Sequence, residues 1–164
     1  MVRVVLGLGS NIGSRLNYLR KAVKGICLLP GFDFLALSGI YETEPWGFKE
    51  QNKFLNCILV CSCRLEPEEA IRALRKVEKE TGRKMRGKWR KREIDIDILF
   101  YGNRIVNKSG LVIPHPELAK RNFVLKPLAQ LAPGLAHPVL KRSMEYLNNH
   151  TTDKNKVYLY SEKL

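Results

Sequence analysis

The stretch FLNCILVCSCRLEPEEAIRALRKVEKETG, residues 54–82, joins the pattern of a buried strand directly to that of an amphipathic helix. Residues 54–63 are uncharged, and strand alternation places five of their side chains on one face: Leu55, Cys57, Leu59, Cys61 and Cys63. Pro67 with its acidic neighbours is typical of a helix start, and Gly82 is a typical stop. The apolar stripe between them consists of Ala70, Ile71, Leu74 and Val77. We therefore predict a strand over 54–63 and a helix from Pro67 to Gly82.

Three further strands and one helix are expected around this unit. Residues 2–8 form an apolar run, and Ser14 can cap a helix with the stripe Leu16, Leu19, Val23 and Ile26. Residues 34–41 and 94–101 also have strand patterns. The order strand, helix, strand, strand, helix, strand is that of a ferredoxin-like α+β sandwich, an antiparallel sheet with two helices on one face and the other left for ligands. A doubly wound nucleotide fold needs strict strand-helix alternation, which the adjacent strands 34–41 and 54–63 break.

The rest of the chain is expected to add only small elements. A turn at Gly102-Asn103 should lead into a short strand at 104–106. Short helices are expected at 117–120, 123–130 and 141–149, with a late strand at 157–160. No repeat or linker interrupts the sequence, so residues 1–164 are predicted to be a single domain with an extra C-terminal helical segment.

The composition favours anionic partners for this chain. Its formal net charge of +13 attracts substrates that carry several negative charges, and nucleotide, nucleic acid and acidic membrane all satisfy that condition. No apolar run approaches the roughly 20 residues of a membrane span, so a cytoplasmic protein is expected. Three of the four cysteines share the buried face of strand 54–63. Reduced, buried thiols explain them better than a metal site at Cys61-x-Cys63, which has no second pair of ligands nearby.

The segment Glu93-Ile-Asp95-Ile-Asp97-Ile-Leu99 alternates carboxylates with isoleucines. Strand geometry sends Ile94, Ile96 and Ile98 into the core and points Asp95 and Asp97 to the opposite face, about 6 to 7 Å apart along the strand. Such a pair can hold one or two Mg²⁺ ions together with substrate phosphates. The plainer interpretation is an exposed strand face that is acidic by chance.

A basic run, Arg83-Lys84-Met-Arg86-Gly-Lys88-Trp89-Arg90-Lys91-Arg92, directly precedes the two aspartates. A run of this kind is usually a solvated face or a nucleic-acid patch. Beside two carboxylates it favours polyphosphate, because arginines can clamp the oxygens that Mg²⁺ bridges. An RNA reader of similar topology would carry stacking aromatics in a central strand, and that motif is absent from the sequence.

Other candidate motifs are weaker. Gly7-Leu-Gly9-Ser-Asn-Ile-Gly13 fails the dinucleotide fingerprint at Ile12, and no P-loop sequence is present. We expect these glycines to serve a tight turn, with Asn11 bracing neighbouring loops. His115, between two prolines, has a fixed backbone and could add a phosphate contact together with Arg121 and Phe123, although lone histidines are more often structural.

The ordered set of motifs resembles the 6-hydroxymethyl-7,8-dihydropterin pyrophosphokinases of folate biosynthesis. It runs from about residue 4 to about residue 133 and consists of Gly9-Ser10-Asn11, Tyr41-x-Thr43-x-Pro45-x-Gly47, Phe54-Leu-Asn56, Gly82-Arg83, Trp89, Arg92-x-x-Asp95-Ile-Asp97-Ile-Leu99, Pro114-His115 and Arg121-x-Phe123. The resemblance implies a ferredoxin-like monomer that transfers a pyrophosphoryl group from ATP to the pterin hydroxymethyl group and releases AMP. It also implies small-molecule substrates, with no nucleic acid and no membrane as partner.

The resemblance further implies the site residues. Two Mg²⁺ ions are expected at Asp95 and Asp97, with Arg83 and Arg92 as catalytic cations. The implied pterin pocket consists of Thr43, Pro45, Trp46, Phe54, Asn56 and Phe123. The implied ATP contacts are Glu78, Arg83, Trp89, Arg92, Ile98, His115 and Arg121. The resemblance leaves open which of Lys84, Met85 and Arg86 contacts phosphate.

Two rival functions remain on the sequence alone. A non-catalytic RNA-binding module would use the basic run 83–92, and an ordinary kinase would pass only the γ-phosphoryl group of ATP. The sequence offers cations and metal ligands but no convincing nucleophile-base pair, so no general base is assigned.

Overall fold

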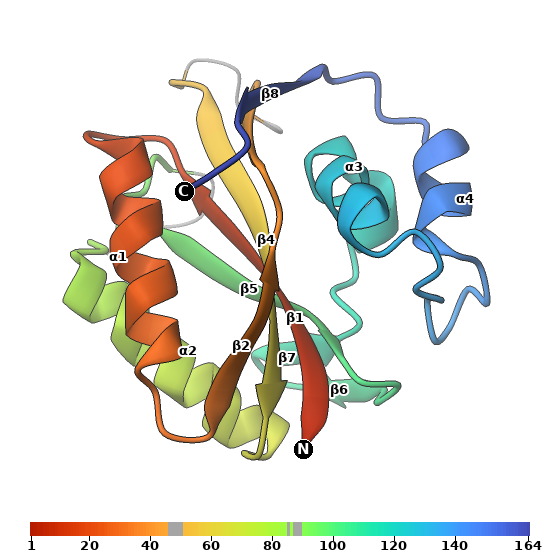
Figure 1. Cartoon of the computed structure of the whole chain (residues 1–164), viewed down its shortest axis with the longest axis horizontal. Coiled ribbons are helices and arrows are strands. Elements are labelled where there is room, and N and C mark those ends of the chain that lie inside the picture. The colour runs from red at the N-terminus through yellow and green to blue at the C-terminus, as the bar shows by residue number, and fades with distance from the viewer. Residues whose placement is uncertain (46–50, 85, 87–89) are drawn as a thin grey trace.

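The computed structural model describes residues 1–45, 51–84, 86 and 90–164, and its centre is a six-stranded antiparallel sheet with helices on both faces (Figure 1). The sheet order is β5-β1-β4-β3-β8, with β2 also paired to β4. The elements are β1 (Val2–Ser10), α1 (Arg15–Cys27), β2 (Phe32–Leu37), β3 (Ile40–Thr43), β4 (Phe54–Cys63), α2 (Pro67–Thr81), β5 (Asp95–Tyr101), β6 (Val106–Lys108), β7 (Leu111–Ile113), a 3₁₀ turn (Leu118–Lys120), α3 (Asn122–Leu131), α4 (Met144–Asn149) and β8 (Val157–Ser161). The predicted ferredoxin-like α+β fold is confirmed.

Helices α1 and α2 lie side by side on one face of the sheet (Figure 1). Helix α2 begins at Pro67, as predicted, with the Glu66 backbone N–H donating to the Glu69 carboxylate at 3.0 Å. It ends at Gly82, whose φ of +107° is a left-handed conformation that favours glycine. The core under the two helices contains Ile94, Ile96 and Ile98, each at most 4% exposed, together with the three strand cysteines. Those cysteines are free thiols.

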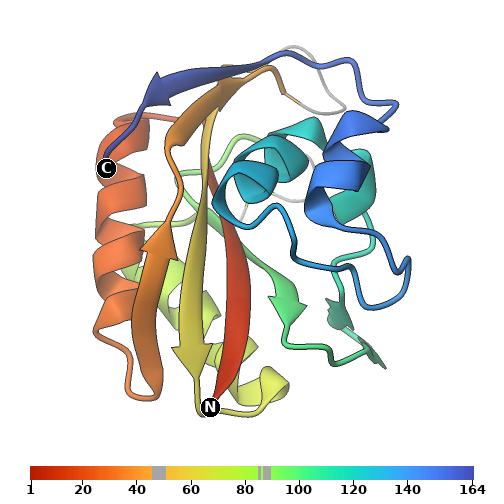
Figure 2. The ribbon, with the colours of Figure 1, turned by 45° about the vertical axis from the view of Figure 1, so that its right-hand side comes forward.

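Helices α3 and α4 pack against part of the other face of the sheet (Figure 2). They bury a second apolar cluster that includes Val5, Ile58 and Phe100 from the sheet and Leu125 and Leu128 from α3. We expected this face to be left for ligands, but α3 and α4 cover part of it, because α3 supplies its own apolar stripe. Among the described residues, a part of the face beside α3 remains open.

Two strand predictions also needed correction. The strand predicted over 34–41 is two strands, separated at Ser38-Gly39, and both remain paired with β4. Ser38 bridges the break, since its N–H donates to the Ile58 carbonyl at 2.9 Å and its Oγ accepts the Ile58 N–H at 2.8 Å. The short strand after the Gly102 turn lies at 106–108 instead of 104–106, and it pairs with β7.

The last helix begins three residues later than predicted, at Met144. Residues 137–142 turn back on themselves, with the His137 N–H donating to the Arg142 carbonyl at 2.8 Å. Ser143 then caps the helix by accepting the Tyr146 N–H at 3.1 Å. The predicted late strand is confirmed as β8, which pairs with β3 so that Val157 lies opposite Thr43. None of the helices in the described residues combines the length and the apolarity that crossing a membrane requires.

Candidate active site

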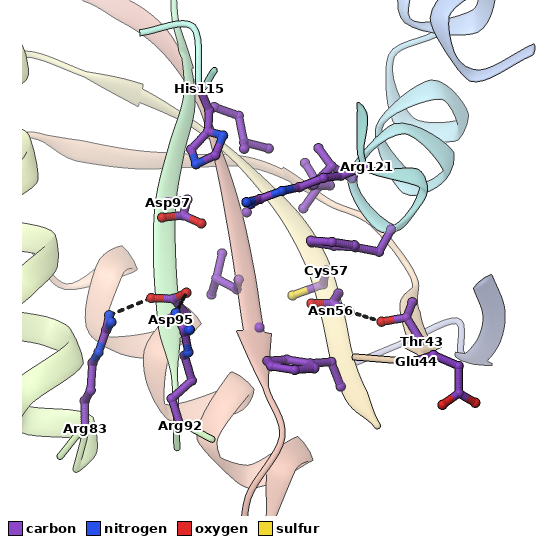
Figure 3. Close-up of a pocket in the computed structure, with 18 residues that line it drawn as sticks. Thr43, Glu44, Asn56, Cys57, Arg83, Arg92, Asp95, Asp97, His115 and Arg121 are labelled. Carbon is purple, nitrogen blue, oxygen red and sulfur yellow. Dashed lines mark hydrogen bonds and ion pairs between the residues drawn. The ribbon is translucent and has the colours of Figure 1, made fainter. Parts of the chain in front are cut away.

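A cavity of about 760 Å³ opens on the sheet face beside α3 (Figure 3). Its volume is in the range of small-molecule sites. Its walls come from β1, β3, β4, β5, α3 and the segments before β5 and α3. The described lining residues are Gly7, Leu8, Gly9, Thr43, Glu44, Phe54, Asn56, Cys57, Ile58, Arg83, Arg92, Asp95, Asp97, Leu99, His115, Arg121, Phe123 and Val124.

Asp95 and Asp97 both face this cavity, as strand alternation predicted (Figure 3). Strand β1 lies against them in antiparallel register, with Gly9 opposite Asp95 and Gly7 opposite Asp97. The expectation of a tight turn is wrong for Gly7 and Gly9, because both lie within β1. It is confirmed for Gly13, which has a φ of +63° in the bend between β1 and α1. A Cβ at Gly9 would lie 2.8 Å from the Asn56 Oδ1, so glycine is required there by the neighbouring side chain.

Two arginines hold Asp95. Arg83 approaches one carboxylate oxygen at 2.7 Å, and Arg92 pairs with the other. Arg83 also pairs with Glu78 of α2, whose carboxylate accepts the Ile96 N–H at 2.8 Å. Glu78 is 7% exposed, and burial raises its pKa despite the neighbouring guanidinium. Glu78 therefore fixes Arg83 from behind and ties it to the start of β5.

Asp97 lies two residues after Asp95 on β5 and is likewise half-buried. Burial and then the charge of Asp95 raise its pKa to about 7, while Arg121 acts in the opposite direction. Figure 3 shows the Arg121 side chain reaching towards Asp97 from the side of α3. A divalent cation between the two aspartates would favour the ionised form of both.

His115 lies above Asp97, on the segment that follows β7 (Figure 3). Its backbone N–H donates to the Leu99 carbonyl at 3.1 Å, which attaches this segment to β5. Its Nδ1 accepts the Glu117 N–H at 3.2 Å, so a neutral ring carries its proton on Nε2. Burial and then the charge of Arg121 lower the pKa of His115 to about 4. His115 is therefore a neutral hydrogen-bond donor near pH 7.

The opposite end of the cavity is less charged and more apolar. Phe54, Asn56 and Thr43 line it from β4 and β3, and Phe123 lines it from α3. The Asn56 amide donates to the Thr43 Oγ1 at 2.8 Å. Asn56 is 6% exposed and Thr43 is 3% exposed, so this pair is a fixed polar feature between aromatic walls. The Arg121 guanidinium lies 5.8 Å from the Phe123 ring centre and connects the two ends.

The structure thus brings ten of the predicted site residues to one cavity: Thr43, Phe54, Asn56, Arg83, Arg92, Asp95, Asp97, His115, Arg121 and Phe123. Three others do not line it. Pro45 is buried beside it, Glu78 lies behind Arg83, and the Ile98 side chain is in the core under α1 and α2. Trp46 and Trp89 lie outside the described residues.

Lys84 and Arg86, two of the three residues considered for a phosphate contact, both bind Glu93 in this structure. The Arg86 guanidinium binds the Glu93 carboxylate through two contacts at 2.8 and 2.5 Å, and the Lys84 N–H donates to the same carboxylate at 3.2 Å. These bonds, with that to Arg86 largest, lower the pKa of Glu93 to about 2. Met85 lies outside the described residues.

Sequence reasoning missed the lining residues Gly7, Leu8, Gly9, Glu44, Cys57, Ile58, Leu99 and Val124. Leu99 shares the strand parity of the two aspartates and could have been found from it. Gly7 and Gly9 required the β1–β5 register, for which the sequence has no local signal. Val124 required the packing of α3 against the sheet.

The described residues contain no group of three or more histidine, cysteine or acidic side chains that could alone enclose a metal ion. The two aspartates nevertheless fit Mg²⁺, which uses one or two carboxylates and takes its other ligands from water and phosphate. They would hold it at the charged end of the cavity, where Arg83, Arg92 and Arg121 also gather.

Comparisons with known proteins agree with this geometry. Residues 5–133 match the family described as 7,8-dihydro-6-hydroxymethylpterin-pyrophosphokinase (HPPK). The 2-amino-4-hydroxy-6-hydroxymethyldihydropteridine pyrophosphokinase of Aquifex aeolicus (strain VF5) is 41% identical over 94% of this chain and 95% of its own length. The protein of that name from Bacillus subtilis (strain 168) is 37% identical over 77% of this chain and 75% of its own.

The fold is also found in a solved structure. The crystal structure titled Plasmodium falciparum HPPK-DHPS wild type matches with a TM-score of 0.72 and 15% identity, over 90% of this chain and 44% of that one. At this low identity, the structural likeness supports the fold alone. The family match and the sequence relatives cover most of the chain, and the chain belongs to the 7,8-dihydro-6-hydroxymethylpterin-pyrophosphokinase family.

Proposed function

We propose that this chain transfers the pyrophosphoryl group of ATP to the hydroxyl group of 6-hydroxymethyl-7,8-dihydropterin, giving the pterin diphosphate of folate biosynthesis and AMP. The observation that carries the proposal is the division of a single cavity into two ends. One end gathers two carboxylates and three arginines, and the other presents a fixed polar pair between aromatic walls. Family membership specifies the reaction to which these two ends belong.

The less charged end suits a flat heterocycle. Phe54 and Phe123 supply aromatic surface on which a pterin ring can stack. The Thr43 and Asn56 pair offers hydrogen-bonding groups to the polar edge of the ring, and it is held in place before any ligand binds. Gly9 keeps the floor beside Asn56 free of a side chain. We assign the pterin to this end, with Pro45 and Trp46 as further contacts.

The charged end suits the phosphates of ATP. The cavity is lined there by Arg83, Arg92 and Arg121. Each guanidinium group can bind two phosphate oxygens at once. His115, neutral near pH 7, can donate its Nε2 proton to a further oxygen. We assign Trp89 to the nucleotide as well, and we place the adenosine near the start of β5, where Glu78 and the backbone at Ile98 lie.

Asp95 and Asp97 would hold Mg²⁺, and we propose two ions. Bound there with ATP, Mg²⁺ would neutralise phosphate charge and polarise the phosphorus that is attacked. Arg83 and Arg92 are paired with Asp95 in this structure, so they can exchange that carboxylate for phosphate oxygens when ATP binds.

The chemistry needs positioning and charge compensation more than a covalent group on the protein. The pterin hydroxyl oxygen attacks the β-phosphorus of ATP in line. A bond forms between these atoms while the bond between the β-phosphorus and the oxygen bridging to the α-phosphorus breaks. AMP leaves with that oxygen, and the hydroxyl proton is released. The arginines stabilise the charge that develops on the phosphate oxygens.

Three broader assignments accompany the reaction. We propose that residues 1–164 act as one catalytic domain and as a monomer, because the described cavity is built within one chain. We propose the cytoplasm as its compartment, which suits the three buried free thiols Cys57, Cys61 and Cys63. The formal charge of +13 is assigned to attraction of the anionic nucleotide, with no nucleic acid or membrane as partner.

Identification of the nucleotide product tests the proposal. The purified chain is incubated with ATP, Mg²⁺ and 6-hydroxymethyl-7,8-dihydropterin, and the products are separated by ion-exchange chromatography. We expect AMP and the pterin diphosphate in equal amounts, and neither when the pterin or Mg²⁺ is omitted. ADP in place of AMP would mean transfer of the γ-phosphoryl group alone. No turnover, together with tight RNA binding that Mg²⁺-ATP does not displace, would mean an RNA-binding module.

A further inference from the structure

The segment that leads from α4 to β8 passes the first turn of α3 and bonds to it (Figure 1). Its contact residue is Asp153, which is half-buried and is not among the described residues that line the cavity. The Asp153 Oδ2 accepts the backbone N–H of Asn122 at 2.8 Å, across 31 positions of sequence. Asn122 begins α3, and its two neighbours in sequence, Arg121 and Phe123, both line the cavity.

The carboxylate of Asp153 is held in place by its own segment. Its second oxygen, Oδ1, accepts the Asn155 N–H at 3.0 Å, and the Asp153 N–H donates to the Thr151 Oγ1 at 3.2 Å. The Asn122 side chain adds two contacts, because its Nδ2 lies 3.2 Å from the Asp153 carbonyl and 3.1 Å from the Asn155 carbonyl. The turn at 151–155 and the start of α3 therefore form one hydrogen-bonded unit.

Helix α3 has no side-chain cap of its own. The first backbone N–H groups of a helix lack partners within the helix, and a side chain at the N-cap position usually supplies an acceptor. The N-cap of α3 is Arg121, which makes no such bond, and the first turn contains no acidic residue. Asp153 supplies both the acceptor and the negative charge that a helix start favours. It therefore caps α3 from a distant segment.

We infer that Asp153 is a positioning residue that sets where Arg121 and Phe123 enter the cavity. This inference rests on the proposed function. Arg121 precedes Asn122 and reaches towards Asp97 (Figure 3). Phe123 follows Asn122 and lines the pterin end. A shift of the backbone at Asn122 would therefore move both side chains. Because in-line transfer depends on accurate placement of its groups, a displacement of about 1 Å can lower the rate about a hundredfold.

A residue that merely caps α3 would affect stability and nothing else. Lys126 offers the comparison, because it ties the same helix to the same part of the chain. Its Nζ donates to the Val157 carbonyl at 2.8 Å, about one helical turn beyond Asn122. Loss of either tie should lower stability. Loss of catalysis should follow only when the tie beside Arg121 and Phe123 is removed.

Three variants separate these roles. Asp153→Ala removes the acceptor of the Asn122 N–H, whereas Asp153→Asn keeps an amide oxygen that can accept it. Lys126→Met removes the bond to Val157 but keeps a long side chain, and it is the matched control. The single-turnover rate of AMP formation and the KM for the pterin are measured at a temperature at which circular dichroism shows every variant folded. Single-turnover conditions separate the chemical step from product release.

We expect Asp153→Ala to lower the single-turnover rate roughly ten- to a hundredfold, because Arg121 no longer meets the phosphate oxygens in the transition state. The KM for the pterin should rise about three- to tenfold, because Phe123 is displaced from its stacking position. Asp153→Asn should recover most of both losses. Lys126→Met should keep the wild-type rate and KM even though its Tm falls.

Double variants show whether Asp153 acts through these two side chains. Combined with Arg121→Met, Asp153→Ala should cause no further loss of rate. Combined with Phe123→Ala, it should cause no further rise in the KM for the pterin. Residues that act as a unit are not additive, whereas a general loss of stability would multiply with either substitution. Full multiplication in both double variants would overturn the inference.

Other outcomes would overturn it as well. The inference fails if Asp153→Ala keeps the wild-type rate and KM, or if Asp153→Asn or Lys126→Met loses as much as Asp153→Ala does. If Asp153→Ala does not fold, Asn122→Ala tests the same unit by removing only its side-chain contacts, and unchanged kinetics there overturn the inference. A wild type that makes no AMP would overturn the proposed function and this inference with it. AMP formation that Asp153→Ala matches would overturn the role of Asp153 alone.

Discussion

Strand β5 has two faces that differ in almost every physical respect, although they alternate along the same few residues. Ile96 and Ile98 lie in the apolar core under α1 and α2, as does Ile94 just before the strand, and each is at most 4% exposed. Asp95 and Asp97 face a cavity that gathers arginines. The core face needs shape and burial, while the cavity face concentrates charge that the fold itself does not require. Alternate side chains along this strand therefore serve different purposes, with stability on one face and chemistry on the other.

The largest effect is expected on the cavity face. Asp97→Asn should lower kcat by about a thousandfold or more, which is ~4 kcal/mol of transition-state stabilisation, because one of the two proposed Mg²⁺ ligands is lost. Initial rates of AMP formation measure this. The matched control is Asp33→Asn, which changes an exposed carboxylate paired with Arg64, and it should keep full activity.

The same variant should not lose stability. The pKa of Asp97 is raised to about 7 in the folded protein, so its ionisation above that pH favours the unfolded state, where its pKa is ordinary. An amide has no such cost. We therefore expect the Tm of Asp97→Asn at pH 8, without Mg²⁺, to equal or exceed that of the wild type. A large fall in Tm would break the separation of the two faces.

On the core face, the expected effect is on folding. Ile96→Ala leaves a cavity under α2 and should lower the free energy of unfolding by about 2 to 4 kcal/mol. Urea denaturation followed by circular dichroism measures the change. Val112→Ala, at a 41% exposed position of β7, should cost far less and is the control. Equal losses from the two truncations would contradict the assignment of Ile96 to the core.

Gly9 sharpens the comparison, because it borders the cavity without any side chain. In Gly9→Ala the new methyl group would meet the Asn56 Oδ1 and push that side chain from its position beside Thr43. We expect the KM for the pterin to rise roughly ten- to a hundredfold, or about 1.4 to 2.8 kcal/mol, with little change in the KM for ATP. Gly134→Ala, which meets no atom within 4 Å, is the control.

The smallest effect concerns the pH dependence of stability. The pKa of His115 is lowered to about 4 from an ordinary value of about 6.5. The unfolded chain therefore binds the proton more readily between these values, and stability falls as pH decreases from about 6.5 to 4. The full shift corresponds to about 3 kcal/mol, and solvent at the partly exposed ring reduces the expected effect to roughly 1 kcal/mol.

His115→Gln should remove that part of the acid sensitivity. Unfolding free energies are measured between pH 4 and pH 8, and that of the wild type should fall relative to that of the variant by roughly 1 kcal/mol as the pH decreases from about 6.5 to 4. His150→Gln, at an exposed position, is the matched control. A constant difference between wild type and His115→Gln would show that His115 does not change charge in this range.

The sequence predicted those parts of the site that lie on single elements. Parity along β5 located both aspartates and their isoleucine neighbours, and the α2 boundaries followed from Pro67 and Gly82. The family resemblance supplied Thr43 and Asn56, which no local pattern had distinguished. Contacts between distant segments were beyond reach, because the β1–β5 register decides that Gly9 lies opposite Asp95 and local sequence does not specify register. The packing of α3 over part of the sheet was missed for the same reason.

The pairing of β8 with β3 has a practical consequence for handling the protein. β3 ends at Thr43, which lines the cavity, and Val157 of β8 lies directly opposite it. Lys126 of α3 also donates to the Val157 carbonyl at 2.8 Å, so the strand is held on two sides. An affinity tag or fluorescent label attached next to β8 would therefore disturb the wall of the cavity. Val2 begins β1 opposite Cys63, at the other end of the sheet (Figure 2), so a label beside Val2 would lie away from this wall.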